Sequence, residues 1–384
     1  MKIMFQYYNG GGGALENIMI LLSRLAQDNP EDQYIIVCNK TSKLNELKSI
    51  PNVVIVKPKY LFHKELTRLY LGFFGLKKLV NILKPDVVWS MNLGSYVKIN
   101  TVNILSVNNS HQVYPLKDTK SHPNSLFHVL LMRFFFRLSL RVANRIFTQT
   151  DVVKGYVNRI APDKNITVFT KVVENEKDIK LVPVPVRVQV KLNSIKNTFS
   201  MLYVATNYGH KNHKVLIDAL AILASENKNI SLILSLTEDE AIYIGRDIAK
   251  QLIQSGHLCC IGWVDKNWLK HLYDFSSICL MPSILESLSS AYLEAMVWGV
   301  PQLVSNLPFA QETCRDAAIY CDPFNAEHWS QEVSRIMNDK SLYAQLQQKG
   351  LARIDEFPSD WTEVVNKYHN VFLEEVNKKG YNLC

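Results

Sequence analysis

The chain has 384 residues, of which 47% are hydrophobic and 20% charged, a composition typical of folded globular proteins and not of disordered ones. This length exceeds one ordinary hydrophobic core and predicts two domains of similar size. The formal net charge of +8 favours an anionic surface or substrate as a partner, and every long apolar run is broken by Arg or Lys before it could cross a bilayer.

Cysteines and paired carboxylates give no sign of a metal site. The seven cysteines are scattered and include no Cys-x-x-Cys pair, which favours a reducing compartment. No Asp-x-Asp pair is present, and the acidic residues at 238–240 fall on an expected helix as a solvated face. Met1 and Lys2 lead into only a short apolar run, so no signal peptide is expected. We therefore predict a cytoplasmic protein that needs no metal and no cofactor.

The first strand is expected at Lys2–Tyr7, and Gly10–Gly13 then opens a helix from Ala14 to about Ala26. A glycine-rich turn at this place is able to cradle a phosphate. The dinucleotide pattern Gly-x-Gly-x-x-Gly fails, because its last glycine would fall on Leu15 or Glu16. An NAD-dependent oxidoreductase is therefore disfavoured, and a turn without a ligand stays an alternative.

Short β-branched runs separated by helical stretches continue through the first half and predict a parallel sheet covered by helices. In such a sheet, ligands bind beyond the carboxyl ends of the strands. A polar loop, Asn108–Pro115, follows one of these runs and places His111 at that edge, where an ordinary loop histidine is the alternative. The runs are Tyr34–Val37, Val53–Val56, Val87–Ser90, Val102–Val107, Ile146–Thr148 and Ile166–Phe169.

Two expected helical segments of this half, 57–84 and 126–145, are both apolar and basic. In the second, arginines at 133, 137, 141 and 145 follow a four-residue step, which lines them along one helical face. A basic amphipathic helix fits an interface with anionic lipid head groups. The alternative is a helix packed on the core with a solvated cationic stripe. No nucleic-acid-binding motif accompanies these residues, so nucleic acid is not an expected partner.

A composition shift at 174–197, with Pro183, Pro185 and repeated valines, marks the expected passage between two domains, and an edge strand is one reading of its valines. A second alternation of strands and helices follows it. Its strands are expected at Met201–Ala205, Ser231–Ser235, Leu258–Ile261, Ile278–Met281, Gln302–Val304 and Ile319–Cys321.

The stretch 276–305 combines the features of a ligand site, because it reads as strand, loop, helix and strand. Ser289 or Ser290 can cap the helix, and Gly299 closes it after Trp298. The free amides at the helix start suit a diphosphate, while Glu286 in the loop and Glu294 in the helix accept hydrogen bonds from sugar hydroxyls. Lys211, in the loop 206–213, is placed to neutralise the same diphosphate.

The spacing Glu286-x7-Glu294, followed by Ala295-Met296, Gly299 and Pro301, resembles the donor-site signature of the retaining GT-B glycosyltransferases of family 4. The resemblance implies two Rossmann-like domains facing a cleft: residues 1–173 with 361–384 on the acceptor side, and residues 198–360 for the donor. The last segment, Trp361–Asn377, is then a helix that crosses back onto the first domain.

The same resemblance implies roles for individual residues. Glu294 would bind the ribose of a nucleotide-diphosphate sugar, Glu286 the transferred sugar and Lys211 the leaving group. His111 would lie near the reacting carbon. Further donor contacts are expected from Gly12, Gly13, Leu288, Ser289, Ser290, Gly262 and Val264.

Two departures from the family pattern concern the donor site. Ser287-Leu288-Ser289 stands where the family usually has Gly-Phe-Gly, and the arginine usual before Lys211 is absent. The expected function is a retaining, metal-independent hexosyltransferase of surface polysaccharide, such as lipopolysaccharide, or of glycolipid synthesis. It would act at the inner face of the cell membrane on a lipid-linked saccharide. A transferase with a soluble acceptor and a non-catalytic scaffold subunit are the alternatives.

Overall fold

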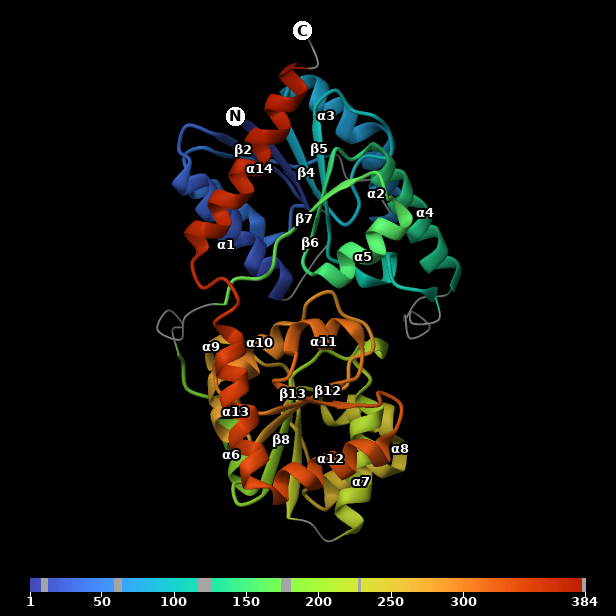
Figure 1. The fold of residues 1–384 in the computed structure, drawn as a ribbon, viewed down its shortest axis with the longest axis vertical. Coiled ribbons are helices and arrows are strands. Elements are labelled where there is room, and N and C mark those ends of the chain that lie inside the picture. Colours follow the sequence, from blue (N-terminus) through green and yellow to red (C-terminus); the bar gives the residue numbers. More distant parts are fainter. Residues whose placement is uncertain (8–12, 59–63, 117–125, 174–180, 227–228, 382–384) are drawn as a thin grey trace. The chain divides into compact units, whose positions relative to one another are not determined.

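The computed structural model describes residues 1–7, 13–58, 64–116, 126–173, 181–226 and 229–381, which form two compact units (Figure 1). The first unit contains Met1–Tyr114, Asn124–Val172 and Asp360–Cys384. The second contains Val173–Ser359 and a short stretch after Tyr114.

The described part of the first unit contains a seven-stranded parallel sheet in the order β3-β2-β1-β4-β5-β6-β7. Its central strands are buried along nearly their whole length, which explains why their sequences are largely continuous apolar runs. Each expected strand is present within about two residues of its expected bounds. The strands are β1 (Lys2–Gln6), β2 (Gln33–Val37), β3 (Val53–Val56), β4 (Val87–Met91), β5 (Val102–Val107), β6 (Arg145–Thr148) and β7 (Asn165–Val168).

Helices cover this sheet, and the segment expected to be helical at 57–84 is divided. Its described part forms α2, a π-helical turn and α3, and a Cβ on Gly72 in that turn would lie 2.2 Å from the ring of Tyr96. A glycine is therefore required there. The helical elements are α1 (Gly13–Asp28), η1 (Lys43–Ser49), α2 (Lys64–Tyr70), η2 (Leu71–Gly75), α3 (Leu76–Leu83), η3 (Ser110–Gln112), α4 (Leu126–Val142), α5 (Asp151–Ile160) and α14 (Trp361–Tyr381).

Helix α14 comes from the C-terminal end of the chain and lies against α1 of the first unit (Figure 1). Its Tyr368 stacks on Phe169 with ring centroids 3.7 Å apart. The expectation that Arg145 extends an arginine stripe along one helix is wrong. Helix α4 ends at Val142, and Arg145 is a buried residue of β6 that forms ion pairs with Glu374 at 2.6 Å and Glu375 at 3.3 Å. The glutamates of α14 make this burial of a guanidinium tolerable.

The second unit is also a parallel sheet, with the order β10-β9-β8-β11-β12-β13 in the described residues. The valines at 186–190 form part of a helix, α6 (Val186–Ser194), and not an edge strand; Val188 and Leu192 point into the core. The strands are β8 (Phe199–Tyr203), β9 (Ile230–Leu234), β10 (Leu258–Cys260), β11 (Ile278–Met281), β12 (Gln302–Ser305) and β13 (Ala318–Cys321).

Two Rossmann-like parallel-sheet units thus confirm the expected α/β fold class. None of the described helices is both long enough and apolar enough to pass through a bilayer. The helices of the second unit, besides α6, are η6 (Gly209–Lys211), α7 (His213–Ser225), α8 (Glu238–Gln254), α9 (Lys266–Phe275), α10 (Ser290–Val297), α11 (Pro308–Cys314), α12 (Ala326–Asn338) and α13 (Lys340–Ile354).

Candidate active site

The carboxyl ends of β8 and β11 bring two of the expected site residues together. Lys211, in the turn after β8, places its Nζ atom 2.5 Å from Oε1 of Glu286, in the loop after β11. The two strands are neighbours in the sheet, so their loops leave from the same edge. Both side chains are mostly shielded, with exposed fractions of 17% and 12%. An ammonium and a carboxylate thus lie in contact where a parallel sheet binds ligands.

Three further contacts hold these two loops against each other. The carbonyl of His210 accepts a hydrogen bond from the amide of Ile284 at 2.9 Å. The hydroxyl of Tyr203 donates to the carbonyl of Lys211 at 2.9 Å and lies 3.0 Å from Oγ of Ser283. Burial raises the pKa of this phenol well above its usual value, so the hydroxyl keeps its proton. Because the loops are tied on both sides of the ion pair, its geometry is fixed by the fold.

Asn212 joins its own loop to two others by hydrogen bonds, a role that its place in the sequence did not indicate. Its backbone has φ +54°, a left-handed conformation that asparagine tolerates better than most residues. From there, its side-chain amide donates to the carbonyls of Pro282, at 3.2 Å, and of Pro323, at 2.6 Å. The only signal available in the sequence was an asparagine directly before the apolar pattern of α7, which marks a helix start.

Helix α10 begins directly after the loop that carries Glu286. Ser289 occupies the N-cap position with extended backbone angles, but its side chain makes no capping hydrogen bond. The start of a helix carries a partial positive charge, and in α10 this end adjoins the loop of Glu286. Leu288, Ser289 and Ser290 are all half-buried at this helix start, and Gly299 closes the far end with φ +62°.

Glu294 lies one turn into α10 and has a defined partner. Oε2 of Glu294 accepts a hydrogen bond from the hydroxyl of Tyr273 on α9 at 3.1 Å. Burial, and then the charge of Glu294, raise the pKa of Tyr273 well above its usual value, so the phenol remains a donor. Tyr273 thus holds one carboxylate oxygen of Glu294 in place.

Gly262 and Val264 belong to the loop that follows β10 in the same sheet. Gly262 has φ +75°, and its amide donates to the carbonyl of Leu236 at 2.9 Å. The side chain of Trp263 between them is 70% exposed. Strand β10 is two places from β8, so these loops are separated by two strand spacings, about 10 Å.

The remaining expected site residues belong to the first unit. His111 is buried in η3, where its amide donates to Oδ1 of Asn109 at 3.1 Å and its carbonyl accepts from Nε of Arg133 at 2.9 Å. Gly13 begins α1, and Gly12 lies outside the described residues. The sequence had not indicated that Arg133 braces the His111 loop.

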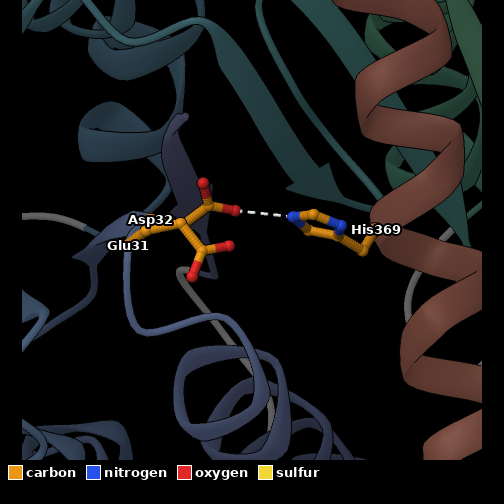
Figure 2. Close-up of side chains that lie close together, drawn as sticks. All are labelled: Glu31, Asp32 and His369. Carbon is orange, nitrogen blue, oxygen red and sulfur yellow. Dashed lines mark hydrogen bonds and ion pairs between the residues drawn. The ribbon is translucent and has the colours of Figure 1, made fainter.

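Among the described residues, one group of side chains that could ligate a metal occurs, and it belongs to the first unit. Ligand atoms of Glu31, Asp32 and His369 lie within 4.8 Å of one another. Nε2 of His369, on α14, lies 2.7 Å from Oδ2 of Asp32, directly before β2 (Figure 2). Asp32 also accepts a hydrogen bond from the backbone nitrogen of Met1. These two partners satisfy the buried carboxylate of Asp32. Its contact with His369 also joins α14 to the start of β2.

Known structures share the whole architecture at low sequence identity. Alr3699/HepE of Anabaena, solved with UDP and glucose, covers 97% of this chain and 100% of its own, with a TM-score of 0.69 and 14% identity. A glycosyltransferase of Rickettsia africae covers 98% of both chains, with a TM-score of 0.69 and 15% identity. Sucrose-phosphate synthase of Thermosynechococcus elongatus gives a TM-score of 0.68 at 14% identity, over 97% of this chain and 98% of its own. The two units therefore have the GT-B fold.

Residues 187–353, less than half of the chain, match the family described as glycosyl transferases group 1. O-antigen chain mannosyltransferase B of Escherichia coli is 28% identical over 175 residues, 44% of this chain and 45% of that protein. The chain thus spans about half the length of this relative. O-antigen chain mannosyltransferase RfbU of Salmonella typhimurium is 23% identical over 269 residues, 66% of this chain and 71% of that protein.

Proposed function

We propose that this protein transfers a hexosyl group from a nucleotide-diphosphate sugar to a saccharide acceptor, with retention of anomeric configuration and without a metal. The observation that carries the proposal is the contact of Lys211 with Glu286 beside the amide-rich start of α10. In one place it combines a cation and backbone amides for a departing diphosphate with a carboxylate for the sugar.

The reaction breaks the bond between the anomeric carbon and the diphosphate oxygen, and it forms a bond from that carbon to an acceptor hydroxyl. Negative charge grows on the diphosphate, where we assign Lys211 and the first-turn amides of α10 to stabilise it. Positive charge grows on the sugar ring, which Glu286 contacts through hydroxyls. The hydroxyl proton leaves with the diphosphate, so the reaction needs no external oxidant or reductant.

The nucleotide would extend along the sheet edge from this centre. Glu294, held by Tyr273, is assigned to the ribose hydroxyls, because a carboxylate accepts two such hydrogen bonds. The loop with Gly262 and Val264 lies about 10 Å from the β8 loop, a distance that suits the base. Gly12, Gly13 and His111 stay assigned to the donor side by family resemblance alone.

The names of the relatives support a role in polysaccharide synthesis. Two relatives are named as O-antigen chain mannosyltransferases, and one structure of similar fold was solved with UDP and glucose. We infer from these names a hexosyl donor and a surface polysaccharide such as lipopolysaccharide as the product. A cytoplasmic position at the inner face of the cell membrane fits a lipid-linked acceptor.

An apolar face of the first unit supports peripheral membrane binding. It consists of Phe74 on η2 together with Phe127, Leu130 and Phe134 on α4, all strongly exposed. Ring contacts from Phe73 to Phe74, from Phe73 to Phe135 and from Phe135 to Phe134 join the two elements. Exposed basic residues lie on α4 and on α3, the helix that directly follows η2, and their charge suits anionic lipid. They are Lys77, Lys78, Arg137 and Arg141.

The proposal is tested by incubating the purified chain with a panel of nucleotide-diphosphate sugars and measuring slow release of the nucleoside diphosphate, with EDTA present. Hydrolysis of one donor, lost in Lys211→Ala, is the expected result. No turnover and no binding of any donor would instead favour a non-catalytic scaffold subunit. The same panel identifies the base and the sugar.

A further inference from the structure

The amino end of β2 carries a cluster of polar side chains, made of Glu31, Asp32 and His369 (Figure 2). The first two residues end the loop between α1 and β2, and His369 comes from α14, 337 positions after Asp32. One ligand atom from each residue lies within 4.8 Å of the other two. Parallel sheets bind their substrates beyond the carboxyl ends of the strands, so this cluster lies at the opposite edge of the sheet.

The fold holds two of these three side chains in place. Oδ2 of Asp32 lies 2.7 Å from Nε2 of His369, while Oδ1 of Asp32 accepts a hydrogen bond from the backbone nitrogen of Met1. The loop itself is fixed by Asn52, whose Nδ2 donates to the carbonyls of Asp32 and Ala26, each at 2.9 Å. Outer hydrogen bonds of this kind orient the ligating oxygen of a carboxylate in metal sites.

The charges around the cluster favour a cation. Helix α1 ends at Asp28 and has no basic residue in its last turn, although the C-terminal end of a helix carries a partial negative charge. Asp28, Glu31 and Asp32 add three carboxylates at this end. Glu31 is exposed, and within the described residues its side chain has neither a hydrogen bond nor an ion pair. It is therefore able to turn toward a cation held by the other two residues.

Tyr34 provides an independent observation. It follows Asp32 by two positions, so the two side chains leave the chain on the same face of the sheet. Tyr34 is 1% exposed, and its hydroxyl has no hydrogen-bond partner in the described chain. Burial, and then the charges of Asp32, Glu31 and Asp28, raise the pKa of this phenol, so the hydroxyl lies near the carboxylates. A buried hydroxyl without a partner needs an explanation, and water bound to a cation is a strong donor to its oxygen.

We propose that Glu31, Asp32 and His369 bind a divalent transition metal of the zinc type, which fastens α14 to the start of β2. A histidine nitrogen combined with carboxylate oxygens suits zinc, whereas calcium and magnesium are bound by oxygen ligands. Tetrahedral zinc needs ligand atoms about 3.3 Å apart, with water as the fourth ligand. Asp32 and His369 separate slightly as the metal replaces the proton between them, and Glu31 closes the third side.

This metal would be structural, so the inference does not depend on the proposed function. The proposed transfer uses residues of other loops and is expected to proceed with EDTA present. Unfolding of the first unit would separate His369 from the two carboxylates, so zinc should bind the folded chain in preference to the unfolded one and stabilise it. No local spacing of ligands could reveal the site, because α14 brings its histidine from the far end of the chain.

The test uses the full chain, treated with EDTA and freed of the chelator, and titrates it with Zn²⁺ by calorimetry and with Co²⁺ by visible absorption. One Zn²⁺ per chain is expected to bind, and Co²⁺ should give the absorption bands of a tetrahedral site. Zn²⁺ should raise the urea concentration at the midpoint of unfolding, and Mg²⁺ should not. Glu31→Gln and His369→Gln should each weaken the Kd for Zn²⁺ about tenfold or more.

Both variants should fold like the parent chain without metal. Glu31→Gln changes an exposed side chain, and in His369→Gln the new amide is still able to donate to Asp32. The matched controls are Glu46→Gln, at an exposed glutamate of η1, and His257→Gln in the second unit, and both should bind Zn²⁺ like the parent chain.

Three results would overturn the inference. The first is that Zn²⁺ does not bind. The second is equal affinity in Glu31→Gln, which would mean an adventitious ion only. The third is Zn²⁺ binding that leaves the midpoint of urea unfolding unchanged, because a metal that joins α14 to β2 must stabilise the folded chain.

Discussion

The Nζ atom of Lys211 lies 2.5 Å from Oε1 of Glu286, although the two residues are 75 positions apart in the sequence. Adjacent parallel strands bring them together, and contacts from Tyr203 and Asn212 fix the two loops. The pair is therefore positioned by backbone and not by its own attraction. Replacement of either residue should leave the loops in place.

Removing either member of this pair is expected to remove transfer and keep the fold. Lys211→Ala and Glu286→Ala should each lower donor turnover at least about a hundredfold, the scale expected when one preorganised electrostatic contact is lost. Steady-state hydrolysis of the identified donor measures this, and circular dichroism checks the fold. Lys214→Ala is the matched control, because Lys214 forms an exposed pair with Asp218 at 2.7 Å on α7. Unchanged turnover in either site variant would refute the assignment.

Tyr273 is expected to act on the donor through Glu294. Tyr273→Phe removes the 3.1 Å hydrogen bond and leaves the ring, so Glu294 loses its fixed orientation. A hydrogen bond to a charged group is worth about 1.5 kcal/mol, which predicts a rise of about tenfold in donor KM with little change in kcat. Glu294→Ala should raise KM further. If kcat falls and KM stays constant in Tyr273→Phe, Glu294 does not bind the ribose.

Most of the fold could be predicted from the sequence, because each sheet is buried on both faces and its strands read as short apolar runs between polar helices. Local pattern failed where tertiary contacts decide. Arg145 continues a helical period but lies in β6, because the glutamates of α14, more than 220 residues later, accept its charge. Valines 186–190 have strand-like composition, but packing of Val188 and Leu192 makes them helical.

The site could be predicted only in part, because several of its residues are positioned by tertiary contacts. Lys211 and Glu286 stand out by residue type and by position after strands. Tyr203, Asn212 and Tyr273 act through single hydrogen bonds to groups far away in sequence, which no local pattern encodes.

Arg145 is expected to contribute to stability and not to lipid binding. In Arg145→Met the buried carboxylate of Glu375 loses its buried partner and keeps only the exposed Lys378, and breaking a buried ion pair in this way typically costs about 3 kcal/mol. Urea unfolding measures the loss. Lys378→Met is the control, since the exposed Lys378 shares the same glutamates and should change stability far less. An equally small effect of both variants would mean that β6 does not depend on α14 for this charge.

His213 is expected to make the second unit sensitive to acid. Burial lowers the pKa of His213 to about 4 in the folded chain, against about 6.5 when unfolded. Below pH 6.5 the unfolded chain binds a proton that the folded chain does not, so stability should fall between pH 6.5 and 4, by about 3 kcal/mol at most. His213→Gln should flatten this part of the profile in urea unfolding, whereas His257→Gln, at a less buried histidine, should not. An unchanged slope in His213→Gln would contradict the assignment.

The apolar face is expected to bind anionic vesicles. Phe127→Ser combined with Phe134→Ser removes two exposed rings, and because burial of a phenylalanine is worth about 2 kcal/mol, the partition coefficient should fall more than tenfold. Co-sedimentation with vesicles containing anionic lipid measures it, and binding should weaken as salt rises. Phe324→Ser is the matched control, because Phe324 is 76% exposed in the second unit. Two outcomes would contradict membrane binding: the parent chain does not sediment with the vesicles, or the double variant binds them as well as the control does. In either case the acceptor is presented from solution, and the exposed rings of α4 have another role.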